Sequence, residues 1–419
     1  MSLLADLLST IWEQRYRSGD SDRRLEKLGI GDLADELIGS KGEISGRAIA
    51  THLLDRYADL EDADKQAFFT HMAQRMSVDP AAVRGALDAY SKDPTKRNYN
   101  ALRDATEPDR QELIRRLNQV PGATGRLVAM RQDLYRLSKD NPALAEVDVD
   151  FLHLFRSWFN RGFLVLRPIS WETPAHILEK IIAYEAVHAI DSWDDLRRRL
   201  QPSDRRCFAF FHPAMPDEPL IFVEVALTKG VPGSIQNVLA EDRTLLAADK
   251  ADTAVFYSIS NCQSGLAGIS FCNSLIKQVV ADLSVELPGL KTFVTLSPIP
   301  GLMKWLKEIG CDKEVENADR LKALGAHYLL SARRDDGSPR DPVARFHLGN
   351  GAMIHAVHAG ADTSEKGMAQ SGGAMVNYRY VLKDISANHE RFATAREIVA
   401  SQEVRSLNNG ATKLIPKDG

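Results

Sequence analysis

A serine and a histidine in the second half of the chain have the types and settings that acid–base chemistry needs. Ser297 follows an apolar segment, and Pro298 behind it favours extended geometry at the serine, so the backbone fixes its hydroxyl. His347 precedes a glycine-containing loop, and histidine is the side chain best suited to proton transfer near neutral pH. The two residues could form a nucleophilic pair, although no third, acidic partner is evident. A plain structural turn explains Ser297 equally well.

Other polar residues give weaker indications. His355 and His358 lie three apart, but no third ligand follows at a matching spacing, so a metal site is not predicted. His212 could line a pocket, although a loop histidine is the simpler interpretation. Asn377 and Tyr380, behind a pair of glycines, could donate to a ligand or bond to neighbouring strands. No Gly-x-Ser-x-Gly motif is present, which argues against an α/β-hydrolase.

A glycine-containing loop at residues 264–268 leads from a predicted strand into a predicted helix. Gly265 and Gly268 allow the backbone to turn tightly, and apolar residues from Leu275 onward recur at helical spacing. Such a loop brings free backbone N–H groups and the positive end of a helix dipole together, which suits a pyrophosphate. The spacing by itself is common, and many such loops only turn a corner.

The apolar pattern changes near residue 150 and predicts two regions. Up to about residue 148 the chain is predicted to be helical throughout. Beyond it strands and helices alternate, which predicts a mixed sheet with helices on both faces. The predicted strands cover residues 163–166, 206–211, 220–227, 255–259, 292–296 and 343–348. The predicted helices cover residues 152–159, 193–200, 235–239, 275–287, 303–308 and 316–330, and another begins near Thr173.

Composition and charge narrow the class of protein. The 419 residues suffice for two or three domains, and 44% hydrophobic with 26% charged residues is ordinary for a globular chain. A net charge of −4 gives no reason to expect nucleic acid as a partner. Four scattered cysteines argue against a disulfide framework or zinc site. No apolar run reaches the ~20 residues of a membrane span, and no signal peptide or peroxisomal tail is recognised, so we expect a cytoplasmic protein.

The order of these motifs resembles the malonyl-CoA decarboxylase family. The similarity is strongest in Leu-Ser-Pro-Ile-Pro-Gly at residues 296–301, which follows Gln-Ser-Gly-Leu-Ala-Gly at residues 263–268. Two such runs in this order are far more specific than either motif alone. The similarity is clear from about residue 150 to residue 382 and loose over the helical part. Further matching segments lie at residues 158–164, 185–188, 218–220, 225–228, 256–260, 275–277, 346–348, 350–352 and 377–380.

The resemblance implies an α+β fold in two domains. An all-helical bundle is expected at residues 1–148, with roles in packing and oligomerisation. A GNAT-like (acetyltransferase-fold) mixed-sheet domain that binds CoA and carries out catalysis is expected at residues 149–419. The resemblance also implies conversion of malonyl-CoA to acetyl-CoA and CO2 without metal, biotin or another prosthetic group, in a homodimer or homotetramer.

Site residues carry over from the resemblance position by position. The family's catalytic serine and histidine match Ser297 and His347, and its supporting tyrosine matches Tyr380. Ser270 departs from the pattern of animal members, which have a glutamate there that could orient the histidine. The CoA-binding loop of the family falls on Ala267, Gly268, Ile269, Ser270, Phe271, Cys272 and Asn273.

Two alternative functions are open at this stage. A GNAT-type acyltransferase would move an acyl group from CoA to an acceptor and release no CO2. A non-catalytic acyl-CoA sensor would bind CoA esters without turnover. If the protein is a decarboxylase, malonate breakdown and the control of malonyl-CoA supply to fatty-acid metabolism are both plausible roles.

Overall fold

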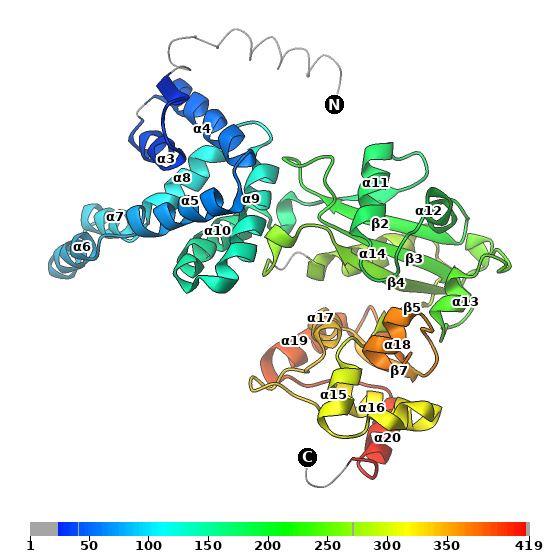
Figure 1. The fold of residues 1–419 in the computed structure, drawn as a ribbon. Helices are drawn as coiled ribbons and strands as arrows, with labels where there is room; N and C mark the ends of the chain where they lie inside the picture. The colour runs from blue at the N-terminus through cyan, green and yellow to red at the C-terminus, as the bar shows by residue number, and fades with distance from the viewer. Residues whose placement is uncertain (1–23, 41, 270–271, 416–419) are drawn as a thin grey trace. The chain divides into compact units, whose positions relative to one another are not determined.

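The computed structural model describes residues 24–40, 42–269 and 272–415, and the chain forms two compact units (Figure 1). The first unit comprises Met1–Phe159 together with Ser264–Ile269, and the second comprises Asn160–Gln263 and Ser270–Gly419. The predicted boundary after residue 148 falls inside one continuous helix, α10 (Ala145–Trp158), which belongs to the first unit throughout. The short segment Ser264–Ile269 also packs with the helices, although the sequence predicts it in the second domain.

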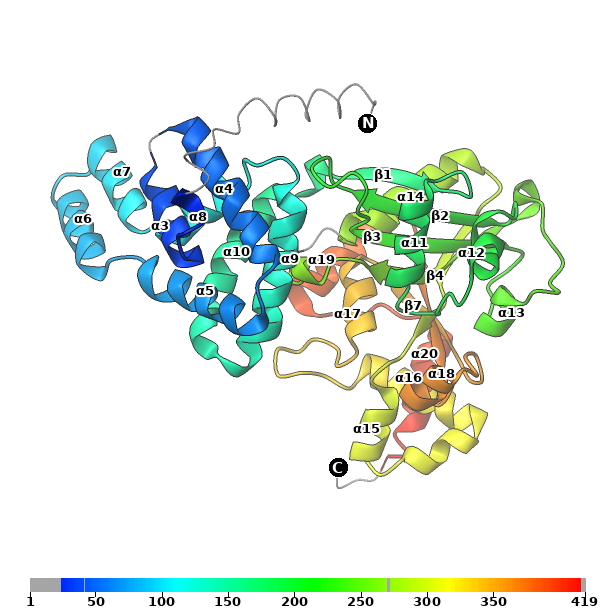
Figure 2. The same cartoon turned by 45° about the horizontal axis from the view of Figure 1, so that its top comes forward.

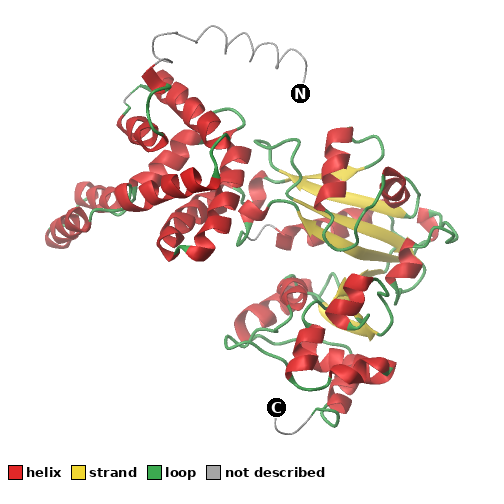
Figure 3. Cartoon of the chain, in the orientation of Figure 1, coloured by secondary structure: helices red, strands yellow, loops and turns green. Residues whose placement is uncertain are grey.

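Helices make up the described part of the first unit, as the sequence predicts (Figure 3). Their apolar faces meet in a core that includes Leu53, Phe68, Leu113 and Leu127. Helices α6 and α7 lie side by side as a hairpin (Figure 2), and neither helix has a buried residue. The helices are α3 (Ile30–Gly39), α4 (Glu43–Ala58), α5 (Asp62–Arg75), α6 (Pro80–Lys92), α7 (Lys96–Ala105), α8 (Asp109–Leu117), α9 (Ala123–Leu137) and α10, with short 3-10 turns at η1 (Ser138–Asp140), η2 (Pro142–Leu144) and η5 (Ser264–Leu266).

The described strands of the second unit form one mixed sheet in the order β1-β2-β3-β4-β5-β8-β6, and β7 also pairs with β8. β4 and β5 pair in parallel, and every other pairing of the described strands is antiparallel. This arrangement agrees with the predicted α+β class and its mixed sheet. The strands are β1 (Val165–Ile169), β2 (Arg205–Phe211), β3 (Ile221–Thr228), β4 (Thr253–Asn261), β5 (Thr292–Thr295), β6 (Ser297–Pro298), β7 (Met353–His358) and β8 (Met375–Tyr380).

Helices cover both faces of this sheet. Ile177 and Ile181 of α11 and Leu196 of α12 pack on one face against Ala209 and Phe222, and α14 lies on the other face (Figure 1). The helices of the second unit are α11 (Ala175–Tyr184), α12 (Trp193–Leu200), α13 (Ile235–Leu239), α14 (Cys272–Glu286), α15 (Leu302–Glu308), α16 (Ala318–Leu330), α17 (Pro342–Gly349), α18 (Glu365–Ser371), α19 (Ile385–Ala395) and α20 (Gln402–Ala411), with 3-10 turns at η3 (Arg161–Phe163), η4 (Ala248–Lys250) and η6 (Asp312–Glu316). None of the helices in the described ranges combines the length and apolar character needed to cross a membrane.

The sheet opens between β4 and β5. The parallel pairing ends at Phe256 and Thr295, after which the chain enters β6 and pairs with β8 instead. β4 continues to Asn261 and stays paired with β3 on its other side. Within the described residues, no strand pairs with the β5 side of β4 beyond Phe256.

One predicted element has the wrong type. Residues 343–348 were expected to form a strand, but they lie in helix α17. Asp341 caps this helix by accepting the Ala344 N–H at 2.8 Å, and Pro342 occupies the first turn. A capping aspartate followed by proline is a strong helix start, and it outweighs the strand preference of a short apolar run. His347 is therefore presented by a helix.

Candidate active site

Ser297, His347 and Tyr380 form a hydrogen-bonded chain in the second unit. The Ser297 Oγ lies 3.2 Å from the His347 Nε2, and the His347 Nδ1 lies 2.8 Å from the Tyr380 hydroxyl. The serine comes from β6, the histidine from α17 and the tyrosine from β8. The structure thus brings together the three residues to which the resemblance assigns catalytic roles.

The imidazole of His347 is enclosed by aromatic rings. It stacks on Tyr378 with a centroid distance of 4.5 Å and an interplanar angle of 24°, and it meets the Phe346 ring edge-on. His347 is only 2% exposed, and this burial lowers its pKa to about 3 because the charged form loses hydration. The free protein therefore holds this histidine in its neutral form at neutral pH.

The hydrogen bonds select one tautomer of the neutral imidazole. Burial raises the pKa of Tyr380 well above its ordinary value, so the phenol keeps its proton and can donate to Nδ1. The serine hydroxyl donates to the Thr295 Oγ1 at 2.8 Å, so its oxygen is the acceptor toward the ring. The hydrogen of the ring therefore sits on Nε2 and points to the Ser297 oxygen, and Nδ1 accepts from Tyr380. The hydrogen bonds therefore all run in one direction, from Tyr380 through His347 to Ser297 and on to Thr295.

A second group of polar residues fixes the serine from behind. The Thr295 Oγ1 also accepts the Tyr378 N–H at 3.1 Å, and the carbonyl oxygen of Thr295 accepts the Asn377 side-chain N–H at 2.7 Å. The Asn377 side chain also bonds to the Pro232 carbonyl and to His358. Asn377 therefore supports the backbone beside Ser297, and none of these hydrogen bonds is to His347.

Ser297 and His347 open onto a cavity of about 240 Å³. The cavity lies where β4 and β5 separate, and four residues on one side of α17 form part of its wall. Its lining is mostly apolar, with few polar groups, as small-molecule sites usually are. The lining residues are Val187, Phe256, Tyr257, Ile259, Asn261, Ser297, Pro298, Pro342, Val343, Phe346 and His347.

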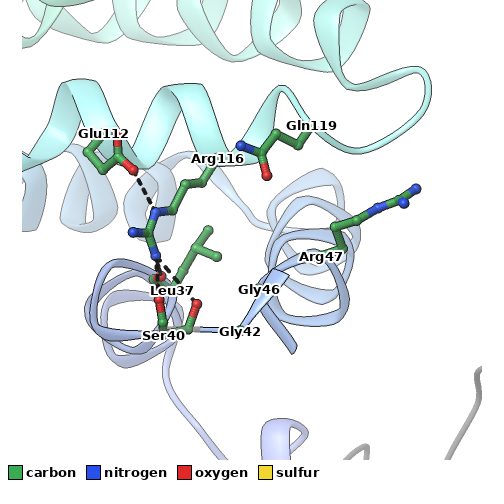
Figure 4. A pocket seen from close by; sticks show the side chains of 8 residues that line it. All are labelled: Leu37, Ser40, Gly42, Gly46, Arg47, Glu112, Arg116 and Gln119. Atoms are coloured by element: carbon green, nitrogen blue, oxygen red, sulfur yellow. Dashed lines mark hydrogen bonds and ion pairs between the residues drawn. The ribbon is translucent and has the colours of Figure 1, made fainter. Parts of the chain in front are cut away.

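A larger cavity of about 500 Å³ lies in the helical unit, but its arginine already has partners (Figure 4). Arg116 donates to the Glu112 carboxylate at 2.7 Å and to the carbonyls of Leu37 and Ser40 at 2.6 and 2.9 Å. Arg47 points away from this group (Figure 4). Arg116 thus satisfies the carbonyls at the end of α3, and the arrangement is structural.

The loop expected to bind CoA lies only partly in the described residues. Ala267, Gly268 and Ile269 belong to the helical unit, while Cys272 and Asn273 begin α14 in the second unit. Ser270 and Phe271, including the position that departs from the family pattern, lie outside the described residues. Gly268 adopts a left-handed φ of +81°, which favours glycine.

Two other histidines considered from the sequence, His358 and His212, make hydrogen bonds of a structural kind. His358 bonds to Asn377, and the His212 Nδ1 accepts the Ala214 N–H at 3.1 Å in its own loop. Across the residues that the structure describes, no three His, Cys, Asp or Glu side chains are grouped so that they could hold a metal ion.

The sequence predictions missed several residues that build the site. Thr295 lies two positions before Ser297 and Tyr378 two before Tyr380, so alternation along an extended chain could have placed each pair on one face. Asp341 could have been found from the same aspartate–proline signal that marks the start of α6 at Asp79. Nothing in the local sequence indicates that Val187 lines the cavity.

Comparison with known proteins gives matches over most of the chain. The family model for the malonyl-CoA decarboxylase C-terminal domain matches residues 162–320 and 310–417, and the model for the N-terminal domain matches residues 76–159. The mitochondrial malonyl-CoA decarboxylase of Anser anser anser is 35% identical over 350 residues, which cover 72% of this chain and 69% of that protein. The mouse (Mus musculus) mitochondrial enzyme is 32% identical over 361 residues, covering 73% and 72%.

Solved structures agree with these matches. The crystal structure of malonyl-CoA decarboxylase from Rhodopseudomonas palustris is 48% identical, covers 90% of this chain and 98% of that one, and superposes with a TM-score of 0.85. The crystal structure of the same enzyme from Agrobacterium vitis is 49% identical, covers 91% and 99%, and has a TM-score of 0.86. The chain therefore belongs to the malonyl-CoA decarboxylase family, a family of carboxy-lyases.

Proposed function

We propose that this protein decarboxylates malonyl-CoA to acetyl-CoA and CO2, with Ser297, His347 and Tyr380 as its catalytic group. The observation that carries the proposal is the polarised chain from Tyr380 through His347 to Ser297, which ends in a mostly apolar cavity. Family membership supports the reaction, and the chain of hydrogen bonds supplies the groups that it needs.

The reaction breaks the bond between the carboxylate carbon and the methylene carbon of the malonyl group. The bonding electron pair moves into the thioester, CO2 leaves, and a thioester enolate remains. An apolar cavity favours this step because hydrogen-bond donors act more strongly on developing charge where water is excluded. In this proposal the Ser297 hydroxyl turns from the Thr295 Oγ1 when substrate binds and donates to the malonyl group.

The enolate then takes up one proton at carbon, and His347 is the proposed donor. The histidine begins neutral, with its hydrogen on Nε2. The negative charge of the bound malonyl group raises the pKa of His347, so that a proton enters with the substrate. That proton balances the overall reaction, in which malonyl-CoA and one proton give acetyl-CoA and CO2. Tyr380 holds the ring in position throughout.

The CoA arm has two proposed contacts. Backbone N–H groups of the loop from Ala267 to Asn273 bind the pyrophosphate, as the resemblance implies and as a loop before a helix allows. The second contact is the edge of β4 beyond Phe256 with which no described strand pairs, and the pantetheine arm is proposed to lie along it. The proposed route uses no metal or prosthetic group.

Self-association and location complete the proposal. We expect a homodimer or homotetramer that associates through the helical unit, where Leu87 on α6 and Tyr99 on α7 are 48% and 55% exposed. Light scattering on the purified protein tests this state. A cytoplasmic location is also proposed, and fractionation of the native cells tests it.

One assay distinguishes the candidate functions. The full chain is incubated with malonyl-CoA in D2O, while CO2 release and deuterium in the acetyl methyl group are followed. A decarboxylase releases CO2 and incorporates deuterium. An acyltransferase modifies an added acceptor without CO2, and a sensor binds malonyl-CoA without turnover. Either of those outcomes rejects the proposal.

Two variants test the assigned residues. Ser297→Ala and His347→Asn each remove one preorganised donor, which typically costs ~2.7–4 kcal/mol of transition-state stabilisation, or a factor of hundreds in kcat. Both variants should still bind CoA. His355→Asn, a half-buried histidine on β7, is the matched control and should turn over at the wild-type rate. Near-normal rates in both site variants would reject the assignment.

A further inference from the structure

The glycine loop that follows β4 is held by a buried arginine of the helical unit. Arg131 on α9 is 2% exposed, and its Nη1 donates to the carbonyl oxygens of Gly265 and Ala267 at 2.7 and 2.9 Å. One guanidinium nitrogen therefore fixes two peptide groups of the loop, and both carbonyls face the interior of the helical unit.

The charge of Arg131 is used within the protein. Its Nε and Nη2 donate to the two carboxylate oxygens of Asp148 at 2.8 and 3.3 Å. This two-point pairing fixes the plane of the guanidinium as well as its position. Arg131 is thus neutralised by Asp148, and its remaining donor is directed at the loop.

Close packing on α9 fixes the loop a second time. Gly265 is buried, and a Cβ at this position would lie 2.0 Å from the Val128 carbonyl oxygen. Only a glycine allows the backbone to approach α9 so closely. Arg131 and Val128 therefore both hold this part of the loop against α9.

This anchoring determines where the next N–H group points. No cis peptide bond occurs in the described chain, and in a trans peptide the C=O and N–H point in opposite directions. Because the Ala267 carbonyl points inward to Arg131, the N–H of Gly268 in the same peptide group points outward. Both Ala267 and Gly268 are exposed, and the left-handed φ of Gly268 is typical of backbone that presents N–H groups to anions.

We propose that Arg131 is a positioning residue for CoA, which holds the loop so that the Gly268 N–H is presented to the phosphate groups. The inference rests on the proposed function, because it assumes that this loop binds the CoA pyrophosphate. Arg131 itself does not touch the ligand. It acts through the loop, and its loss should weaken binding of the phosphate-bearing part of the substrate without changing the chemical step.

The test compares two substrates in two variants of α9. Arg131→Gln removes the anchor. Arg126→Gln, on the same helix α9, removes only an exposed ion pair with Asp55 of α4. Turnover is measured with malonyl-CoA and with S-malonyl-pantetheine, which has no phosphate. For Arg131→Gln we expect KM for malonyl-CoA to rise about tenfold or more, since two hydrogen bonds that order the loop are lost. Its kcat, and its kcat/KM for S-malonyl-pantetheine, should match the wild type, and Arg126→Gln should be unchanged with both substrates.

Further measurements distinguish a folding defect in the Arg131 variants from a loss of CoA binding. Arg131→Lys keeps a cation opposite Asp148 and one donor for the loop, so it should fold and show an intermediate KM, and thermal melting verifies both variants. Calorimetric titration with CoA gives the affinity without turnover. If a folded Arg131 variant binds CoA as tightly as the wild type, or loses activity equally with both substrates, the inference is overturned. Absence of CO2 from the wild type would reject the proposed function alone, and absence of CoA binding by the wild type would overturn both.

Discussion

The Nδ1 atom of His347 and the hydroxyl oxygen of Tyr380 lie 2.8 Å apart, although the residues are 33 positions apart in the chain. One residue is on helix α17 and the other on strand β8. Because the Ser297 hydroxyl donates to Thr295, its oxygen accepts the Nε2 hydrogen of His347, and Nδ1 accepts from the tyrosine. A phenol thus selects the opposite tautomer from the one that a carboxylate selects in a serine–histidine–aspartate triad, and it adds no negative charge.

Removing this hydroxyl should slow turnover. In Tyr380→Phe the ring remains but the tautomer of His347 is no longer selected, so we expect kcat to fall about tenfold to a hundredfold. Tyr378→Phe is the matched control, because its hydroxyl has no hydrogen-bond partner in the described structure while its ring stacks on His347. Steady-state kinetics of both variants test this, and equal effects in the two would contradict the role given to Tyr380.

The pH dependence of the free enzyme should lack the usual histidine step. Burial lowers the pKa of His347 to about 3, so this side chain stays neutral from pH 5 to pH 8 in the free protein. Since kcat/KM reports the free enzyme, we expect no acidic limb near pH ~6.5, where an exposed histidine titrates. S-malonyl-pantetheine is the substrate to use, because it has no phosphate that titrates in this range. A limb near that pH would show that His347 is more solvated than its packing indicates.

Loss of the cap on α17 should affect both stability and turnover. Asp341 is fully buried and accepts the Ala344 N–H, and Asp341→Ala should cost about 0.5–2 kcal/mol and lower Tm. Because α17 carries His347, we also expect kcat to fall, while Asp341→Asn keeps an acceptor oxygen and should largely restore both. Asp79→Ala removes the equivalent cap from α6 in the helical unit and should leave kcat unchanged. If kcat of Asp341→Ala equals that of the wild type, the cap on α17 is not needed for catalysis.

A buried glutamate should make stability depend on pH in the opposite sense from an ordinary carboxylate. Glu224 on β3 is completely buried, which raises its pKa from 4.5 to about 8, although Arg199 lies 3.4 Å away and opposes the shift. Between these values the folded state binds more protons than the unfolded state, so the free energy of unfolding decreases as pH rises from about 4.5 to about 8. Glu224→Gln removes this loss, and its Tm relative to the wild type should increase across that range.

Thermal melts from pH 5 to pH 8.5 test this prediction. Glu286→Gln is the control, because Glu286 is exposed and pairs with Arg206 at 2.7 Å. Its Tm difference from the wild type should not follow the same trend. If the Tm difference between Glu224→Gln and the wild type stays constant from pH 5 to pH 8.5, Arg199 keeps the buried carboxylate ionised.

Local signals in the sequence predicted most elements of the second unit. The helix at 193–200 and the short helix at 235–239 have the expected bounds, since Ser192 and Ser234 cap them. α17 was missed because six residues are too few to distinguish helical from strand periodicity. The aspartate and proline before it were the available signal, and they determine how His347 is presented.

Contacts between distant residues could not be predicted in the same way. The three candidate catalytic residues were identified by resemblance, but their meeting depends on β8 pairing with β5 and β6, which no local pattern specifies. The membership of Ser264–Ile269 in the helical unit was also not predicted. It depends on a bond between Arg131 and Gly265, which lie 134 positions apart. Physical proximity of this kind is a property of the folded chain and has no signature in a short window.

The discontinuous composition of the helical unit also constrains how the chain can be made. When the nascent chain has emerged only as far as Phe159, Ser264–Ile269 has not yet been synthesised. The nascent helical unit then lacks the two carbonyl acceptors of Arg131 and the glycine that packs on the Val128 carbonyl. Each buried polar group left without a partner costs about 1–3 kcal/mol, so the early unit is less stable than the finished one. The last step in the folding of the helical unit must wait until Asn160–Gln263 of the second unit and Ser264–Ile269 have been synthesised. A gene cut after Phe159 would yield a fragment that cannot complete that step.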